Sequence, residues 1–147
     1  MRVKLVYSSI DQLPPERLER LQNVERLKFI RYNAGNIPLG TELTVYGIAV
    51  SDGNVLYDVE HYPGGQVLIV CLAELFDVVD PRASETWECR IPDAGGIRIW
   101  PASWFTYEFY HDRLSDGEPE LQADFKRLKA LFADEAQRGA SSAEPIK

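Results

Sequence analysis

Residues 41–60 read TELTVYGIAVSDGNVLYDVE, which is two β-rich segments joined by a short polar turn. The first segment is rich in β-branched side chains, and in the second Val55, Tyr57 and Val59 recur at every second position. Asp52 and Gly53 lie between the segments and favour the positive φ angles of a tight turn. This stretch therefore predicts an antiparallel β-hairpin at the centre of the fold.

Further short apolar segments surround the hairpin, and Gly, Pro or Asp residues bound most of them. They span residues 2–8, 67–72, 75–79, 86–91 and 97–100. The connections between the later segments are too short for the crossover helices that parallel strands require. We therefore expect a curved, mostly antiparallel sheet of five to seven strands.

Two amphipathic helices are expected to flank this sheet, one near residues 14–31 and one near residues 118–138. Their apolar stripes consist of Leu18, Leu21, Val24 and Leu27, extended by Ile30, and of Leu121, Phe125, Leu128 and Phe132. The aromatic segment 104–113 is compatible with either a strand or a loop. The sequence thus predicts a single α+β domain over residues 1–138 and a flexible polar tail over residues 139–147.

The charge of the chain is distributed unevenly. Its net charge is −7, and residues 34–120 contain fifteen acidic but only four basic residues, together with all three tryptophans. Because this charge repels phosphate backbones, we expect no nucleic-acid ligand. The N-terminus lacks the apolar core of a secretory signal, and no apolar run approaches the ~20 residues of a membrane helix. These features favour a cytoplasmic protein that binds no membrane.

The sequence contains no recognisable catalytic or cofactor-binding motif. Cys71 and Cys89 form no metal-binding pair, no serine lies in a nucleophile elbow, and no glycine-rich phosphate loop is present. We therefore predict no catalytic residue, no metal and no cofactor. The alternative is a small enzyme or metal-binding protein that uses His61 or His111 with neighbouring carboxylates.

Aromatic and acidic residues interleave over residues 57–62 and 107–116, a composition that suits the binding of a basic protein. The three tryptophans are compatible with either core or interface. The predicted partner-binding residues are Tyr57, Asp58, Glu60, Tyr62, Tyr107, Tyr110, Asp112, Asp116 and Glu118. A non-catalytic adaptor is a further alternative, and its binding surface would be the basic face of the first helix: Arg17, Arg20, Arg26 and Lys28.

Four stretches share a pattern with a family of small bacterial proteins. They are GTELTVYGI at 40–48, VLY at 55–57, LFDVVDPR at 75–82 with Ser84 and Trp87, and YHDRLSDGE at 110–118. The chain resembles that family, whose pattern is VYGI … LFxVVDxRxSxxW … DRLxDGE and which looks like the immunity proteins of polymorphic or contact-dependent toxin systems. Pro81 and His111 depart from the pattern. The resemblance implies a protein that is not an enzyme and that neutralises a cognate protein toxin by stoichiometric occlusion.

Overall fold

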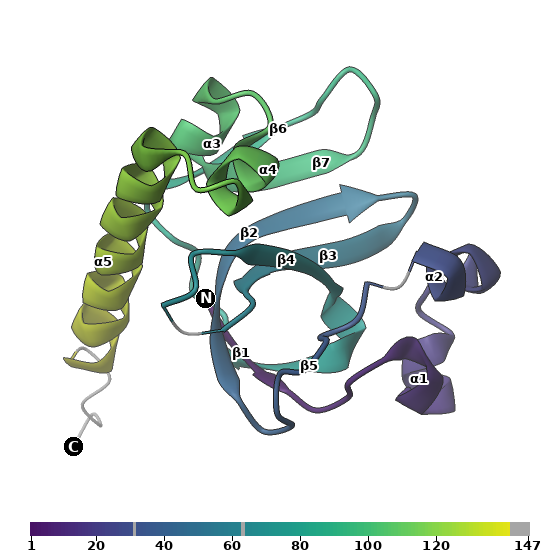
Figure 1. The fold of residues 1–147 in the computed structure, drawn as a ribbon. Coiled ribbons are helices and arrows are strands. Elements are labelled where there is room, and N and C mark those ends of the chain that lie inside the picture. Colours follow the sequence, from purple (N-terminus) through teal and green to yellow (C-terminus); the bar gives the residue numbers. More distant parts are fainter. Residues whose placement is uncertain (31, 63, 142–147) are drawn as a thin grey trace.

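In the computed structural model, which describes residues 1–30, 32–62 and 64–141, the predicted hairpin forms as β2 (Glu42–Ser51) and β3 (Asn54–Glu60) (Figure 1). The turn residues Asp52 and Gly53 have φ angles of 50° and 79°. Two positive φ angles in a two-residue turn match the right-handed twist of the flanking strands. The hairpin prediction is therefore confirmed.

The hairpin belongs to an antiparallel sheet that has seven strands within the described residues, which confirms the expected α+β class. β3 runs along one edge of β2, while β1 pairs with the beginning of its other edge and β7 with its end. The remaining strands are β1 (Arg2–Leu5), β4 (Leu68–Leu72), β5 (Phe76–Asp80), β6 (Trp87–Arg90) and β7 (Ile97–Pro101). Because β2 is shared in this way, it joins both halves of the molecule.

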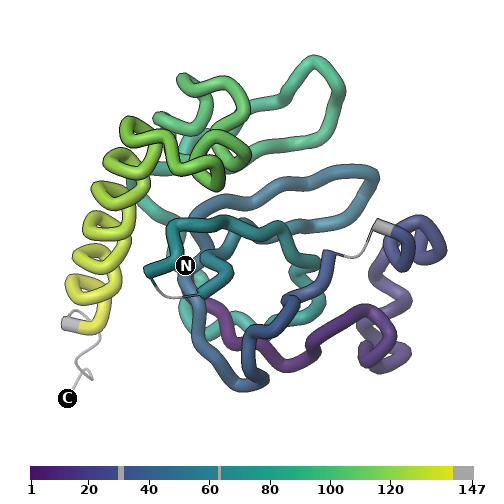
Figure 2. The backbone as a smooth tube through the Cα atoms, in the orientation of Figure 1, coloured from purple at the N-terminus to yellow at the C-terminus, as the bar shows by residue number. Residues whose placement is uncertain are grey.

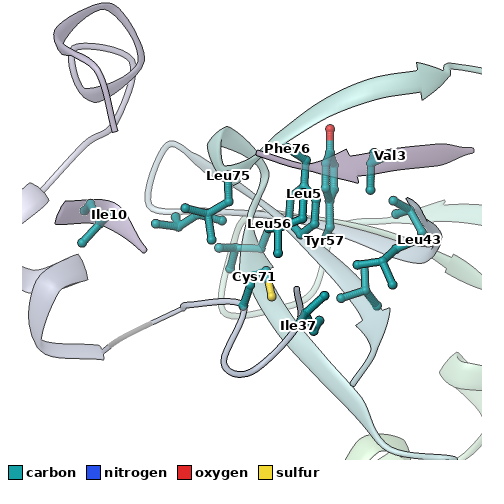
Figure 3. Packing of buried hydrophobic residues seen from close by; sticks show 14 of the residues in the cluster. Val3, Leu5, Ile10, Ile37, Leu43, Leu56, Tyr57, Cys71, Leu75 and Phe76 are labelled. Carbon is teal, nitrogen blue, oxygen red and sulfur yellow. The ribbon is translucent and has the colours of Figure 1, made fainter. Parts of the chain in front are cut away.

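The strands β4-β3-β2-β1-β5 curl around a first hydrophobic core (Figure 2). An irregularity in the register between Val45 and Gly47 adds to the bending of β2. The core is filled by side chains from all five strands and from the loop that precedes β2. Those labelled in Figure 3 include Val3, Leu5, Ile37, Leu43, Leu56, Tyr57, Cys71 and Phe76. Each fully buried aliphatic side chain of this kind contributes roughly 1.5–3 kcal/mol relative to exposure.

A second core lies between the sheet and three helices, α3 (Ala102–Thr106), α4 (Tyr110–Ser115) and α5 (Pro119–Ser141). The predicted stripe of α5 is buried here: Leu121, Phe125, Leu128 and Phe132. Tyr46 of β2 meets it edge-on, with 5.1 Å between the ring centroids of Tyr46 and Phe125. The helix extends beyond its expected end at residue 138, so the predicted tail begins inside it, and residues 142–147 lie outside the described part of the chain.

The prediction of a single helix near residues 14–31 is wrong, because the chain forms two short helices, α1 (Pro15–Leu18) and α2 (Val24–Ile30). The side chain of Asn54 holds the break by accepting from Gln22 N at 2.8 Å and donating to Gln22 O at 3.0 Å. Asn23 has a φ of 54°, which no continuous right-handed helix contains. The break lets Leu21 and Leu27 both reach the first core.

Candidate functional site

A shallow groove opens where β7, α3 and α4 meet, at the upper end of α5 in Figure 1. Its volume is about 290 Å³, and aromatic rings form most of its wall. The residues that line it are Trp100, Trp104, Tyr107, Phe109, Tyr110, His111 and Asp112. We refer to this feature as the α4 groove.

A buried carboxylate behind the lining of the α4 groove is paired with the lining residue His111. Asp58 of β3 is only 3% exposed, and its Oδ1 lies 2.8 Å from Nε2 of His111. The indole nitrogen of Trp100 donates to the other oxygen, Oδ2, at 3.2 Å. Both oxygens of the buried carboxylate therefore have partners, and the histidine ring is held in one orientation.

Gly47 makes room for Asp58 and the two tryptophans. It pairs with Asp58 in the register of β2 and β3, and a Cβ atom at position 47 would lie 2.7 Å from Asp58 Oδ2 and from Trp100 Cδ1. The same atom would be 2.8 Å from the ring of Trp104. Such distances are far below van der Waals contact, so only glycine permits the two tryptophans to pack across β2.

Aromatic stacking fixes the walls of the α4 groove. The ring centroids of Trp104 and Tyr110 are 5.2 Å apart in a stacked arrangement, and His111 meets Trp104 edge-on at 4.8 Å. The Tyr110 hydroxyl donates to Asp124 of α5 at 2.7 Å, which ties α4 to the long helix. Burial and the neighbouring Asp124 carboxylate raise the pKa of Tyr110, so this hydroxyl remains a donor.

Phe109 stands out at the rim of the α4 groove. Its side chain is 68% exposed, and its backbone lies in the left-handed region with φ 55° and ψ 43° immediately before α4. A bulky residue in that region costs of order 1–3 kcal/mol, and such residues cluster at functional sites. The fold therefore holds a large apolar side chain in water at a local energetic cost.

The fifteen carboxylates of residues 34–120 are mostly neutralised in three dimensions. Nine of them form ion pairs with Lys or Arg, and Asp58 pairs with His111. Six of those cations come from outside the segment: Arg2, Arg17, Arg20, Arg26, Lys129 and Arg138. Within the described residues, the carboxylates without an ion pair are Asp93, Glu108, Asp112, Asp116 and Glu120, and four of these five lie at or beside α4.

The predicted partner-binding residues separate into two groups. Tyr107, Asp112, Asp116 and Glu118 lie together around α4, although Glu118 is paired with Arg113 at 2.7 Å. The other five residues contribute no exposed side chain to that surface: Tyr57, Asp58, Glu60, Tyr62 and Tyr110, of which Tyr110 begins α4 but is buried.

The second group requires correction, because most of its side chains are engaged inside the fold. Tyr57 belongs to the first core, Tyr110 is buried against Trp104, and Asp58 is buried against His111. Glu60 pairs with Lys129 of α5 at 3.1 Å. Only Tyr62 is exposed, in the loop that follows β3. A folded partner protein cannot reach the buried members of this group.

His61 and His111 occupy different surroundings. His61 lies against Gly35 and forms an edge contact with the ring of Tyr62, whereas His111 belongs to the α4 groove. Across the described ranges, no three His, Cys, Asp or Glu side chains are grouped closely enough to hold a metal ion. Of the two histidines weighed for an enzyme, only His111 therefore has a carboxylate partner inside a groove.

The basic face weighed for an adaptor is largely occupied. Arg17 donates to the backbone oxygens of Glu74 and Phe76 and pairs with Asp77. The other members pair with neighbouring carboxylates: Arg20 with Glu74, Arg26 with Asp52 and Lys28 with Glu25. The three arginines thus tie the N-terminal segment to the sheet and its connecting loops, whereas Lys28 pairs within α2.

Comparisons of the chain with models of protein families, with curated proteins and with solved structures find no match in any of the three. Within the described residues, every helix is too short or too polar to cross a membrane.

Two features of the site were not singled out by sequence reasoning. Glu108 and Phe109 lie inside the segment of interleaved acids and aromatics, so their composition was the available signal. Gly47 and Trp100 carry no such signal, because their roles depend on the register between β2 and β3 and on the packing of β7.

Proposed function

We propose that this protein is an immunity-type binding protein of the cytoplasm that neutralises a cognate protein toxin by stoichiometric occlusion. Its binding surface would be the α4 patch, which consists of Tyr107, Glu108, Phe109, Asp112, Asp116 and Glu120. The observation that carries the proposal is that four exposed carboxylates without ion pairs lie at or beside α4, which an exposed phenylalanine immediately precedes. The resemblance to immunity proteins supplies the class of partner.

The α4 patch has the chemistry that recognition of a basic protein needs. Phe109 immediately precedes α4, Asp112 lies in its first turn, and Asp116 immediately follows it. The N–H of Asp116 donates to the backbone oxygen of Asp112, so these two carboxylates lie one helical turn apart. Aromatic side chains at the centre of an interface supply most of the buried area, and surrounding charges raise the association rate and the specificity. A toxin domain with a basic cleft would offer the complementary surface.

A capture experiment tests the proposal. The tagged protein is incubated with lysate of its native cells, eluted with rising salt and analysed by mass spectrometry, in parallel with the double variant Asp112→Lys and Asp116→Lys. The control is Glu16→Lys with Glu19→Lys, which makes the same charge change at exposed residues next to and within α1.

We expect wild type and control to retain one basic partner at equal stoichiometry, and the α4 variant to lose it. The purified partner should then be inhibited at a ratio of about one to one, since occlusion is a binding equilibrium. Equal retention by the α4 variant would exclude this surface as the interface. A partner whose activity is unchanged in the complex would refute the immunity role.

A second candidate function rests on the pair formed by Asp58 and His111. A carboxylate that orients a histidine within reach of a groove is the arrangement of a general base. Within the described residues, no protein group other than Asp58 hydrogen-bonds the His111 ring. If the protein is an enzyme, turnover in a hydrolase screen should disappear in His111→Gln and persist in His61→Gln.

A further inference from the structure

We propose that the α4 groove is the receptor for one arginine side chain of the partner protein, with Asp112 as its counter-ion. This inference rests on the proposed function and specifies how the partner is recognised. It commits to a guanidinium group because a planar cation can stack on aromatic rings while it donates two hydrogen bonds to a carboxylate.

The walls of the α4 groove suit a cation. Rings of Trp100, Trp104 and His111 meet there with centroid separations of 4.8–5.9 Å, and Tyr107 and Tyr110 follow at 6.1 Å. The faces of aromatic rings carry negative electrostatic potential, and cations within ~6 Å of a ring centroid are attracted to it. Because the rings pack against one another, little conformational entropy is lost when a ligand enters.

The rim of the α4 groove selects for positive charge. Asp112 lines the groove and is exposed, and Glu108 and Asp116 are exposed nearby. No ion pair with a Lys or Arg of the described residues neutralises these three carboxylates. A neutral apolar side chain would gain the contact area but not the electrostatic attraction.

The same group of rings already holds guanidinium groups from this chain. Arg98 lies 5.7 Å from the centroid of Trp100, and Arg113 lies 5.9 Å from that of Tyr107. Glu118 neutralises Arg113 through contacts of 2.7–2.8 Å, so that cation does not cancel the charge of Asp112. These contacts show that the outer ring faces are compatible with arginine at stacking distance.

The size of the α4 groove favours a single side chain. Pockets for small molecules usually span roughly 300–1,000 Å³ and enclose most of the ligand. The α4 groove has about 290 Å³ and is shallow, so it can take the end of one long side chain. Arginine anchors in such pockets are common among the residues that dominate interface energies.

Titration with L-argininamide, followed by backbone amide NMR shifts, tests the inference without the partner. The neutral isostere L-citrullinamide is the matched probe. We expect saturable shifts concentrated in residues 100–113 with argininamide and shifts several-fold smaller with citrullinamide. Asp112→Asn and Phe109→Ala should each weaken argininamide binding about two- to fivefold, which is the size of an exposed cation–π or ion-pair contribution.

Three results would overturn the inference. They are equal shifts with both probes, non-saturating shifts spread over all acidic surfaces, and equal affinity in Asp112→Asn and in the control Glu16→Gln. Near-ultraviolet circular dichroism establishes that each variant is folded. If argininamide binds the α4 groove but no toxin is captured, the proposed function fails and the arginine receptor stands. If a toxin binds the α4 patch while argininamide does not bind, the proposed function stands and the arginine receptor fails.

Discussion

Replacing Gly47 with alanine tests the packing beneath the α4 groove. The added Cβ would lie 2.7 Å from Asp58 Oδ2 and Trp100 Cδ1, and 2.8 Å from the ring of Trp104. Overpacking of this kind costs about 1–3 kcal/mol. Since the backbone of Gly47 is outside the left-handed region, alanine by itself would stabilise the folded state by about 0.4–1 kcal/mol. The net expectation is a loss of about 1–2 kcal/mol.

For a domain of this size, that loss lowers Tm by about 3–8 °C. The assay is urea and thermal unfolding followed by tryptophan fluorescence, which reports on Trp100 and Trp104 directly. The matched control is Gly65→Ala, where the atoms nearest to the added Cβ belong to the ring of Tyr62. Tyr62 is exposed and can rotate into solvent, so this variant should unfold at or slightly above the wild-type midpoint.

One outcome would contradict rigid packing beneath the α4 groove. If Gly47→Ala is as stable as wild type or more stable, then the tryptophans and Asp58 are free to move and do not form a rigid support for the α4 groove. A preorganised α4 groove would then have no structural basis, and the predicted selectivity for argininamide would lose its physical cause.

Three further outcomes follow from buried or partly buried groups elsewhere in the fold. Arg17→Met should cost about 2 kcal/mol because two backbone oxygens lose a charged donor, whereas Arg20→Met, at an exposed pair, should stay within about 0.5 kcal/mol; urea unfolding measures both. Burial raises the pKa of the Cys71 thiol to about 12, so a thiol reagent at pH 8 should label only exposed Cys89 in the folded protein and both cysteines in denaturant. Burial also raises the pKa of Tyr46 to about 12. The unfolded chain therefore loses the Cys71 proton from about pH 8 and the Tyr46 proton from about pH 9, before the folded protein does. The free energy of unfolding should fall as pH rises towards 12, by up to about 1.4 kcal/mol per pH unit for each group, and should be independent of both groups below about pH 7.5.

Sequence reasoning succeeded where one local rule governed an element. The Asp52-Gly53 turn and the alternation after it predicted the central hairpin, and the spacing of the stripe from Leu121 to Phe132 predicted α5. Both patterns lie in the same stretch of sequence as the element that they predict. No distant contact overrides them, because the second core covers the same stripe that the periodicity identified.

The prediction of a single N-terminal helix was wrong, and the spacing of its apolar residues explains why. An apolar residue at every third position turns by about 60° per step relative to a helix of 3.6 residues per turn. From Leu18 to Leu27 the stripe therefore rotates by about half a circle, so one straight helix cannot bury it. The chain resolves this with a break that Asn54, thirty-two residues later, stabilises.

The binding residues were only partly predictable because exposure depends on the far side of the sheet. Tyr57 and Asp58 are neighbours on a strand and point to opposite faces, so one interface could not have used both. Helices α3 and α4, in a segment that was compatible with strand or loop, cover Asp58. Their formation depends on packing against Trp100 and α5, which local propensity does not encode.

The local excess of acid overstates the charge that a partner protein would meet. Six cations from the two ends of the chain pair with the acidic middle, and pairs such as Arg2 with Glu42 join distant segments. The α4 patch should therefore carry most of the salt dependence of partner binding. Neutralising Asp112 and Asp116 together should lower the association rate at low salt and flatten its dependence on ionic strength. Neutralising Glu42 and Asp52, which are already paired with arginines, should leave that slope nearly unchanged; equal slopes for the two double variants would show that the whole acidic surface steers the partner.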